Sequence, residues 1–281
     1  MGPGDAPAAW RIALRRCVLA VSVLDDVDAL PDADGVILPG TTEVAVPWDE
    51  LARVVGTAEP DGTAARRRVR SWLRLRRRLA DLPDPVTASR PVGLPVGHVL
   101  HPGPAWVRDR VLGGVLDVGT GFSGLLDDPD EVVVVPGELL AAAGLDDRAW
   151  WHRSVAYLDR MGRVAAERLA GQPTTVLRPI GDCDVVTLLA SSAFRSALCA
   201  DDPVGLRSVA VPMRRRGWLD LGRIDPAFAA AAAAATEPAE RGFDRPVLVT
   251  REEVVMAVVG GRPAEIALRD PVGLTQPWHR T

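Results

Sequence analysis

The sequence predicts an α+β protein, in which helices pack on a mixed or antiparallel sheet with no recognised superfold. Short apolar runs bounded by glycine, proline and aspartate predict strands, and longer segments with apolar residues at helical spacing predict helices. A hydrophobic content of 47% and a charged content of 25% are typical of a globular protein. At 281 residues the chain is long enough to bury a large core.

The N-terminal elements begin with an apolar segment at residues 10–24, whose pattern fits a helix or a strand equally. Two short apolar runs at 35–38 and 43–46 flank a Pro-Gly-Thr-Thr turn and predict a β-hairpin. A helix is expected at 47–55, because proline and two acidic residues suit a helix start and Gly56 suits its end.

Residues 64–82 form the most arginine-dense segment and predict an amphipathic helix with a cationic face. Guanidinium groups match phosphate oxygens in shape and charge, so this face is a candidate site for phosphate, RNA or an acidic partner. The alternative is a solvent-facing helix surface, because a chain without lysine uses arginine for every solubilising cation. The candidate patch comprises Arg66, Arg67, Arg70, Arg74, Arg77 and Arg78.

A proline-rich segment at 83–95 follows this helix and is expected to be extended. It is the place where the sequence suggests a break between sub-domains. We nevertheless expect a single globular domain over residues 8–281, because one hairpin and two helices would make a thin core alone.

In the rest of the chain, apolar runs and the glycine, proline and aspartate residues that bound them predict further helices and strands. Asp184 is a natural N-cap for one of the helices. The expected helices are 137–143, 148–170, 185–199 and 225–235. The expected strands are 132–135, 174–177, 208–213, 246–250, 254–259 and 264–268.

The composition excludes several mechanisms. All 33 basic residues are arginine, and neither lysine nor asparagine occurs, which predicts a high-GC genome of actinobacterial type. Without lysine there is no Schiff base, no pyridoxal-phosphate anchor and no P-loop lysine. Without asparagine the protein-kinase motif set and N-glycosylation are also excluded. The net charge of −4 argues against a dedicated nucleic-acid-binding domain.

The cysteines indicate a reducing compartment. Cys17, Cys183 and Cys199 are irregularly spaced and form no CxxC pair, which favours reduced thiols over a disulfide framework or a zinc ribbon. The apolar run at 17–24 is followed by two aspartates and is too short for a membrane-spanning helix. It also lacks the pattern of a signal peptide. We therefore expect a cytoplasmic protein without a membrane partner.

A glycine-rich acidic stretch lies at residues 117–121, where Asp117 precedes Gly119, Thr120 and Gly121. It resembles the first phosphate loop of the actin and sugar-kinase superfamily. The resemblance implies that the aspartate orients hydrated Mg²⁺ while glycine and threonine amides surround phosphate. The family's second acidic-glycine loop and its adenosine motif are not found. The alternative is a turn between strands that uses glycine for its geometry.

Two closely spaced histidines, His98 and His101, form a candidate metal site. Imidazoles beside acidic residues bind Zn²⁺, Fe²⁺ or Mn²⁺, and Asp117 or Asp184 would supply a third ligand. The alternative is a pair of loop histidines that hydrogen-bond to backbone carbonyls.

Residues 181–184 hold the remaining candidate catalytic groups. Cys183 precedes an expected helix, whose dipole favours the thiolate, whereas Asp182 and Asp184 disfavour a further negative charge. A resting thiol is therefore favoured over a nucleophile. The two aspartates could act as a pair of acid/base or metal-binding carboxylates, although capping alone explains Asp184.

These observations favour, by a narrow margin, a binding or accessory protein over an enzyme, because no nucleophile–base set remains. The alternative is a metal- or phosphate/nucleotide-dependent enzyme, which requires that the loops at 98–121 and 181–184 meet in one pocket. The sequence leaves the cofactor, ligand and partner open.

Overall fold

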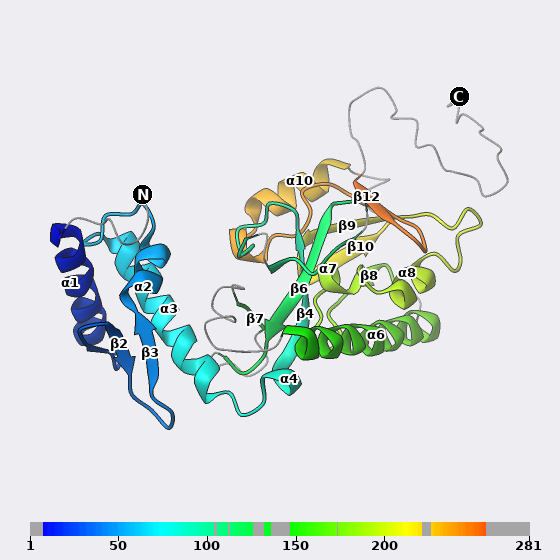
Figure 1. Cartoon of the computed structure of the whole chain (residues 1–281). Helices are drawn as coiled ribbons and strands as arrows, with labels where there is room; N and C mark the ends of the chain where they lie inside the picture. Colours follow the sequence, from blue (N-terminus) through cyan, green and yellow to red (C-terminus); the bar gives the residue numbers. More distant parts are fainter. Residues whose placement is uncertain are drawn as a thin grey trace. The chain divides into compact units, whose positions relative to one another are not determined.

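The protein has an α+β fold, as the sequence predicts (Figure 1). The computed structural model describes residues 8–103, 106–111, 113–125, 132–135, 147–172, 174–220 and 226–256. The described part contains eight α-helices and three antiparallel sheets. None of its helices is both long and apolar enough to cross a lipid bilayer.

The chain forms two compact units. The first unit comprises Met1–Val92, Pro102–Trp106 and Gly119–Ala156, and the second comprises Gly93–His101, Val107–Val118 and Tyr157–Thr281. The first change of unit along the chain follows Val92, inside the proline-rich segment at 83–95.

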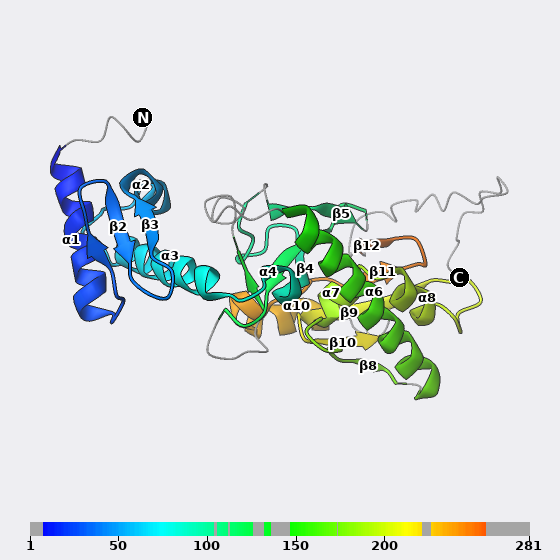
Figure 2. The same ribbon diagram turned by 60° about the horizontal axis from the view of Figure 1, so that its bottom comes forward.

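The N-terminal part of the first unit is a small sheet with helices around it (Figure 2). The predicted hairpin is confirmed, with Val36 opposite Val46. The segment at 10–24 is a helix, and its buried residues lie at helical spacing. The elements are α1 (Ala8–Leu24), β1 (Leu30–Pro31), β2 (Gly35–Leu38), β3 (Val44–Pro47), α2 (Trp48–Val55) and α3 (Thr63–Asp81).

The core of this part forms where α1, α2 and α3 meet the sheet. On α3 the expected apolar stripe is buried at Val69, Leu73 and Leu79, while Trp72 is half-buried. Gly56 ends α2 with a positive φ of 61°, a conformation that glycine adopts without strain.

A four-stranded sheet follows, in the order β4-β6-β5 with β7 paired to β6. Residues 117–121, expected as a loop or turn, instead lie within a seven-residue strand that is buried throughout. Its core in the first unit includes Phe122 and Trp150, whose rings meet edge to face at 5.4 Å. The elements are α4 (Pro85–Ala88), β4 (Ser89–Pro95), β5 (Asp109–Val111), β6 (Leu116–Phe122), β7 (Val133–Val134) and α6 (Asp147–Gly171).

The second unit is built on a five-stranded antiparallel sheet in the order β12-β11-β9-β10-β8. Helix α10 packs against β9. The strands are β8 (Val176–Leu177), β9 (Arg207–Met213), β10 (Arg216–Leu219), β11 (Val247–Val249) and β12 (Val254–Met256). The helices are α7 (Val185–Leu188), α8 (Ser192–Leu198), α10 (Pro226–Ala235) and the short 3₁₀ helix η3 (Pro238–Glu240).

The single helix expected at 185–199 is wrong, because α7 and α8 are separate helices. Ser191 separates them, since its hydroxyl accepts a hydrogen bond from the Phe194 amide and caps α8. Strand β10 was not predicted. The expected helix at 137–143 and strand at 264–268 lie outside the described residues.

Candidate functional site

The arginines of α3 mostly serve the first unit itself. Arg66 and Arg70 bind the carboxylate of Asp25 at 2.7 and 3.2 Å, and Arg74 donates to the Asp25 carbonyl at 2.6 Å. The hydrogen bond from Arg66 holds the pKa of Asp25 below its usual value. These three side chains therefore tie α3 to the residue that follows α1.

A buried ion pair joins α3 to α2. The Nε of Arg76 lies 3.2 Å from Oε1 of Glu50, and both side chains are less than a tenth exposed. The Trp72 indole donates to the same carboxylate oxygen at 2.7 Å. Buried charges need this kind of partnership, because an unpaired ion in the core is costly.

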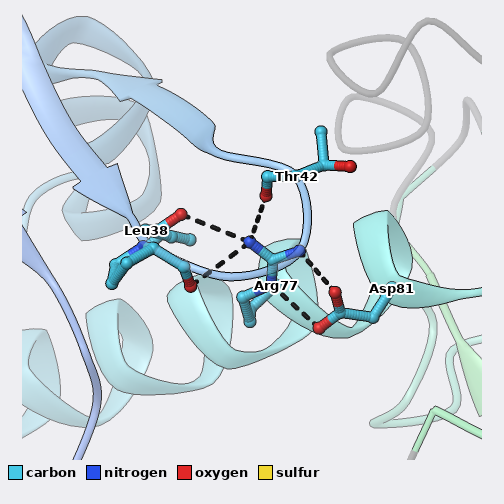
Figure 3. A network of polar contacts seen from close by, with 5 residues as sticks. Leu38, Thr42, Arg77 and Asp81 are labelled. Carbon is cyan, nitrogen blue, oxygen red and sulfur yellow. Dashed lines mark hydrogen bonds and ion pairs between the residues drawn. The ribbon is translucent and has the colours of Figure 1, made fainter.

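Arg77 closes the loop between β2 and β3 (Figure 3). Its NH1 donates to the carbonyls of Leu38 at 3.2 Å, Pro39 at 3.4 Å and Thr42 at 2.5 Å. Its remaining donors bind both carboxylate oxygens of Asp81, one helical turn away. The guanidinium thus donates to three carbonyls at and around the hairpin turn.

These contacts count against α3 as a free cationic surface. Four of the six patch residues, Arg66, Arg70, Arg74 and Arg77, already bind groups of the first unit. The other two patch residues, Arg67 and Arg78, are exposed. The geometry favours an internal role for this face over phosphate or an acidic partner.

The glycines of β6 have a packing role. A side chain at Gly119 would overlap the indole ring of Trp106, and one at Gly121 would meet Val92 and Val132. Trp106 also donates through Nε1 to the Thr120 carbonyl at 2.9 Å. Both glycines lie in a strand, whereas a nest for phosphate needs successive amides in a turn. The geometry therefore favours close packing over a phosphate cradle.

Asp117 is held by an arginine and a histidine within the second unit. Its carboxylate is bound by Arg110 at 2.6 and 3.1 Å and by Nε2 of His101 at 3.1 Å. Asp117 is only 1% exposed, so these hydrogen bonds replace its lost hydration.

His98 lies in the same unit and is half-buried. Its Nδ1 accepts a hydrogen bond from the Leu100 amide at 3.1 Å, so the proton of the neutral ring is assigned to Nε2, which donates to the Arg241 carbonyl at 3.0 Å. Burial lowers the pKa of His98, and the positive charge of Arg214 lowers it further. Asp184 and His101 also act electrostatically on His98. These contacts and two ion pairs link five residues, which we call the polar cluster: His98, His101, Asp117, Asp184 and Arg214.

The loop at 181–184 meets this cluster through Asp184. Its carboxylate caps α7 by accepting from the Thr187 amide at 2.7 Å, and it binds Arg214 at 2.7 Å. The predicted N-cap is confirmed. The Asp182 amide donates to the Tyr157 hydroxyl at 3.3 Å, and the Cys183 side chain is fully buried.

The side chains of the polar cluster are bound to arginines and to the backbone of the same unit. Asp117 and Asp184 each form an ion pair with arginine, and the described residues contain no group of three metal-binding side chains. His98 donates to a backbone carbonyl, which is the contact expected for a loop histidine that does not bind a metal. Complete burial leaves the Cys183 thiol no access to a substrate.

An arginine-lined cavity of about 400 Å³, which is open to solvent, lies beside this cluster in the second unit. Its four charged lining residues are exposed. Sequence reasoning missed it, because the nearest signal was only the run of three arginines after β9. The cavity draws on the ends of β8, β9, β10 and α10, and on η3. Its lining consists of Arg178, Pro179, Met213, Arg215, Arg216, Thr236 and Glu240.

Strand pairing places two of these arginines together. Arg216 begins β10 and Arg178 directly follows β8, next to the pairing of Gly217 with Leu177. Arg216 pairs with Met213 on the other side. The two arginines therefore bring positive charge to the same end of the sheet.

The charged side chains of the cavity form no ion pairs with one another or with the other described residues. The side chains of Arg178, Arg215 and Glu240 form no hydrogen bond or ion pair with any residue that the structure describes. Arg216 lies over the Trp218 ring, 6.0 Å from its centroid. Three arginines against one glutamate leave two positive charges in excess.

The cavity wall is anchored by hydrogen bonds. The Arg214 amide donates to the Glu240 carbonyl at 2.9 Å, and Arg241 donates through Nε to the Thr236 carbonyl at 2.9 Å. The hydroxyl of Thr236 donates to Ala232 at 2.7 Å. Because His98 binds the Arg241 carbonyl, the polar cluster is linked to this wall. The charged side chains are thus presented from a fixed frame.

Comparison with known proteins identifies no relative. No protein-family model, no curated protein and no solved structure matches this chain. Any functional conclusion therefore depends on the geometry of the site.

Proposed function

We propose that the second unit is an anion-binding module and that the arginine-lined cavity is its ligand site. The observation that carries the proposal is the presence of Arg178, Arg215 and Arg216 around one cavity, with two positive charges in excess. Guanidinium groups form charge-assisted hydrogen bonds to phosphate and carboxylate oxygens. A bound anion would also offset this excess of positive charge.

A binding role agrees with the chemistry around the cavity. The polar cluster supports the wall through Arg214 and Arg241 and offers no group of metal ligands among the described residues. We place the module in the cytoplasm, because Cys17, Cys183 and Cys199 are buried thiols outside any disulfide.

The test is isothermal titration calorimetry of the full chain with inorganic phosphate and sulfate. Arg215→Ala is expected to weaken binding about tenfold or more, since a hydrogen bond to a charged group contributes about 1.5–3 kcal/mol. The matched control is Arg163→Ala, because Arg163 is an exposed arginine of the same unit that does not line the cavity. Equal affinities for the wild type and Arg215→Ala would refute the site.

A further inference from the structure

We infer that the ligand of this cavity is a phosphate monoester of a small organic molecule that carries a hydrogen-bond donor. This inference rests on the proposed anion-binding function. It follows from the distribution of charge around the cavity, from its size and from its apolar lining.

The excess charge matches a phosphate monoester. The cavity has three arginines and one glutamate, which leaves two positive charges. A phosphate monoester carries about −1.5 to −2 at pH 7, whereas a single carboxylate carries only one negative charge. The phosphate of a monoester therefore neutralises the guanidinium groups more completely than a carboxylate does.

Glu240 defines a second, separate requirement. No guanidinium nitrogen of the described residues lies within 4.0 Å of its carboxylate, so its oxygens are available as acceptors. The Thr236 hydroxyl donates to Ala232 and keeps its lone pairs as a further acceptor. A ligand that places an N–H or O–H group here gains a hydrogen bond, whereas a second anionic group is repelled.

The size of the cavity leaves room for an organic part. Its volume of about 400 Å³ lies in the range of about 300–1,000 Å³ that is usual for small-molecule sites. It greatly exceeds the share of a single water molecule in the liquid, about 30 Å³. Met213 and Pro179 give the organic part an apolar surface, and a methionine side chain adapts to irregular shapes.

The experiment compares two esters that differ in a terminal ammonium group, which adds N–H donors and a positive charge that Glu240 can bind. Calorimetry of the full chain with phosphoethanolamine and with ethyl phosphate is repeated on Glu240→Gln, a variant that keeps the size of the side chain and removes its charge. Adenosine 5′-monophosphate is the larger probe, and inorganic phosphate is the reference. Thermal unfolding of each variant verifies that it is folded.

The wild type is expected to bind phosphoethanolamine at least tenfold more tightly than ethyl phosphate. In Glu240→Gln this preference should fall to about threefold or less, while ethyl phosphate binds at least as well as before. Equal affinities for the two esters in the wild type, with adenosine 5′-monophosphate no tighter than inorganic phosphate, would overturn the inference and leave the anion site standing. If no ester, phosphate or sulfate binds the wild type, the proposed function itself falls.

Discussion

Arg110 and Asp117 are register partners on β5 and β6, and their side chains are joined at 2.6 and 3.1 Å. The pair is asymmetric, because the Asp117 side chain is 1% exposed and that of Arg110 is 56% exposed. A buried charge that loses its partner is destabilising, whereas an arginine at the surface can turn into water.

This asymmetry predicts that Arg110→Ala destabilises the protein more than Asp117→Asn does. The first change leaves a buried carboxylate with His101 alone, and the second removes the charge itself. For Asp117→Asn we expect a loss of about 1–2 kcal/mol in the free energy of unfolding, from the weakened hydrogen bonds. Urea denaturation measures both. The opposite order of the two variants would contradict the account of Asp117 as a buried, arginine-dependent anion.

His98 predicts a dependence of stability on pH. Burial, and then Arg214, lower its pKa from the ordinary value of 6.5, so the unfolded chain binds the proton more readily than the folded one. The contribution of neutral His98 is fully present above about pH 6.5. It is lost as the pH falls from there through the lowered pKa, with a slope of at most about 1.4 kcal/mol per pH unit.

The variant His98→Gln tests this dependence, because glutamine keeps an N–H donor for the Arg241 carbonyl and does not titrate. Urea midpoints between pH 7.5 and pH 5 should fall less steeply for the variant than for the wild type. His152→Gln, at an exposed histidine of α6, is the control and should follow the wild type. Parallel pH profiles for His98→Gln and the wild type would exclude His98 as the source.

The sequence predicted those helices and strands whose structure is determined by local residue patterns. The β2–β3 hairpin follows from two apolar runs around Pro-Gly-Thr-Thr, and α6 follows from its apolar spacing and the terminal Gly171. Strand β6 was not predictable, because a glycine-rich sequence such as Gly119-Thr120-Gly121 is equally typical of a turn. What distinguishes them is the Trp106 indole over Gly119, a tertiary contact.

The site depended even more on tertiary structure. Helical spacing gave the faces of α3, but not the fact that Asp25 and the carbonyls of the β2–β3 turn lie opposite its arginines. In the second unit Arg178 and Arg216 are distant in sequence, and both adjoin the pairing of Leu177 with Gly217 between β8 and β10. Strand β10 is short and begins directly after an arginine run, so its pairing had no clear signal.

Gly119→Ala tests the packing role of the β6 glycines. The added methyl group would overlap the Trp106 indole, and overpacking of this kind costs about 1–3 kcal/mol. Gly171→Ala is the matched control, since the end of α6 has open space around it, and we expect no loss of stability there. Guanidinium denaturation measures both free energies. A neutral Gly119→Ala would show that the strand does not require glycine at this position.

Replacement of Arg77 tests how much the stability of the first unit depends on an arginine that binds its own backbone. Arg77→Ala removes the donor for the Leu38, Pro39 and Thr42 carbonyls, and we expect a loss of about 2 kcal/mol in the free energy of unfolding. Arg77→Lys should recover only part of this loss, because an ammonium group lacks the planar fork that reaches the turn and Asp81 together.

The control for Arg77 is Arg67→Ala on the same helix. The Arg67 side chain is exposed and forms no hydrogen bond or ion pair within the described part of the chain, so its replacement should change the free energy of unfolding by about 0.5 kcal/mol or less. Hydrogen exchange at residues 39–43 adds a local readout, because the turn should lose protection in Arg77→Ala and keep it in Arg67→Ala. If the two alanine variants unfold alike, the arginines of α3 do not hold the unit together, and a role at the surface becomes the better explanation.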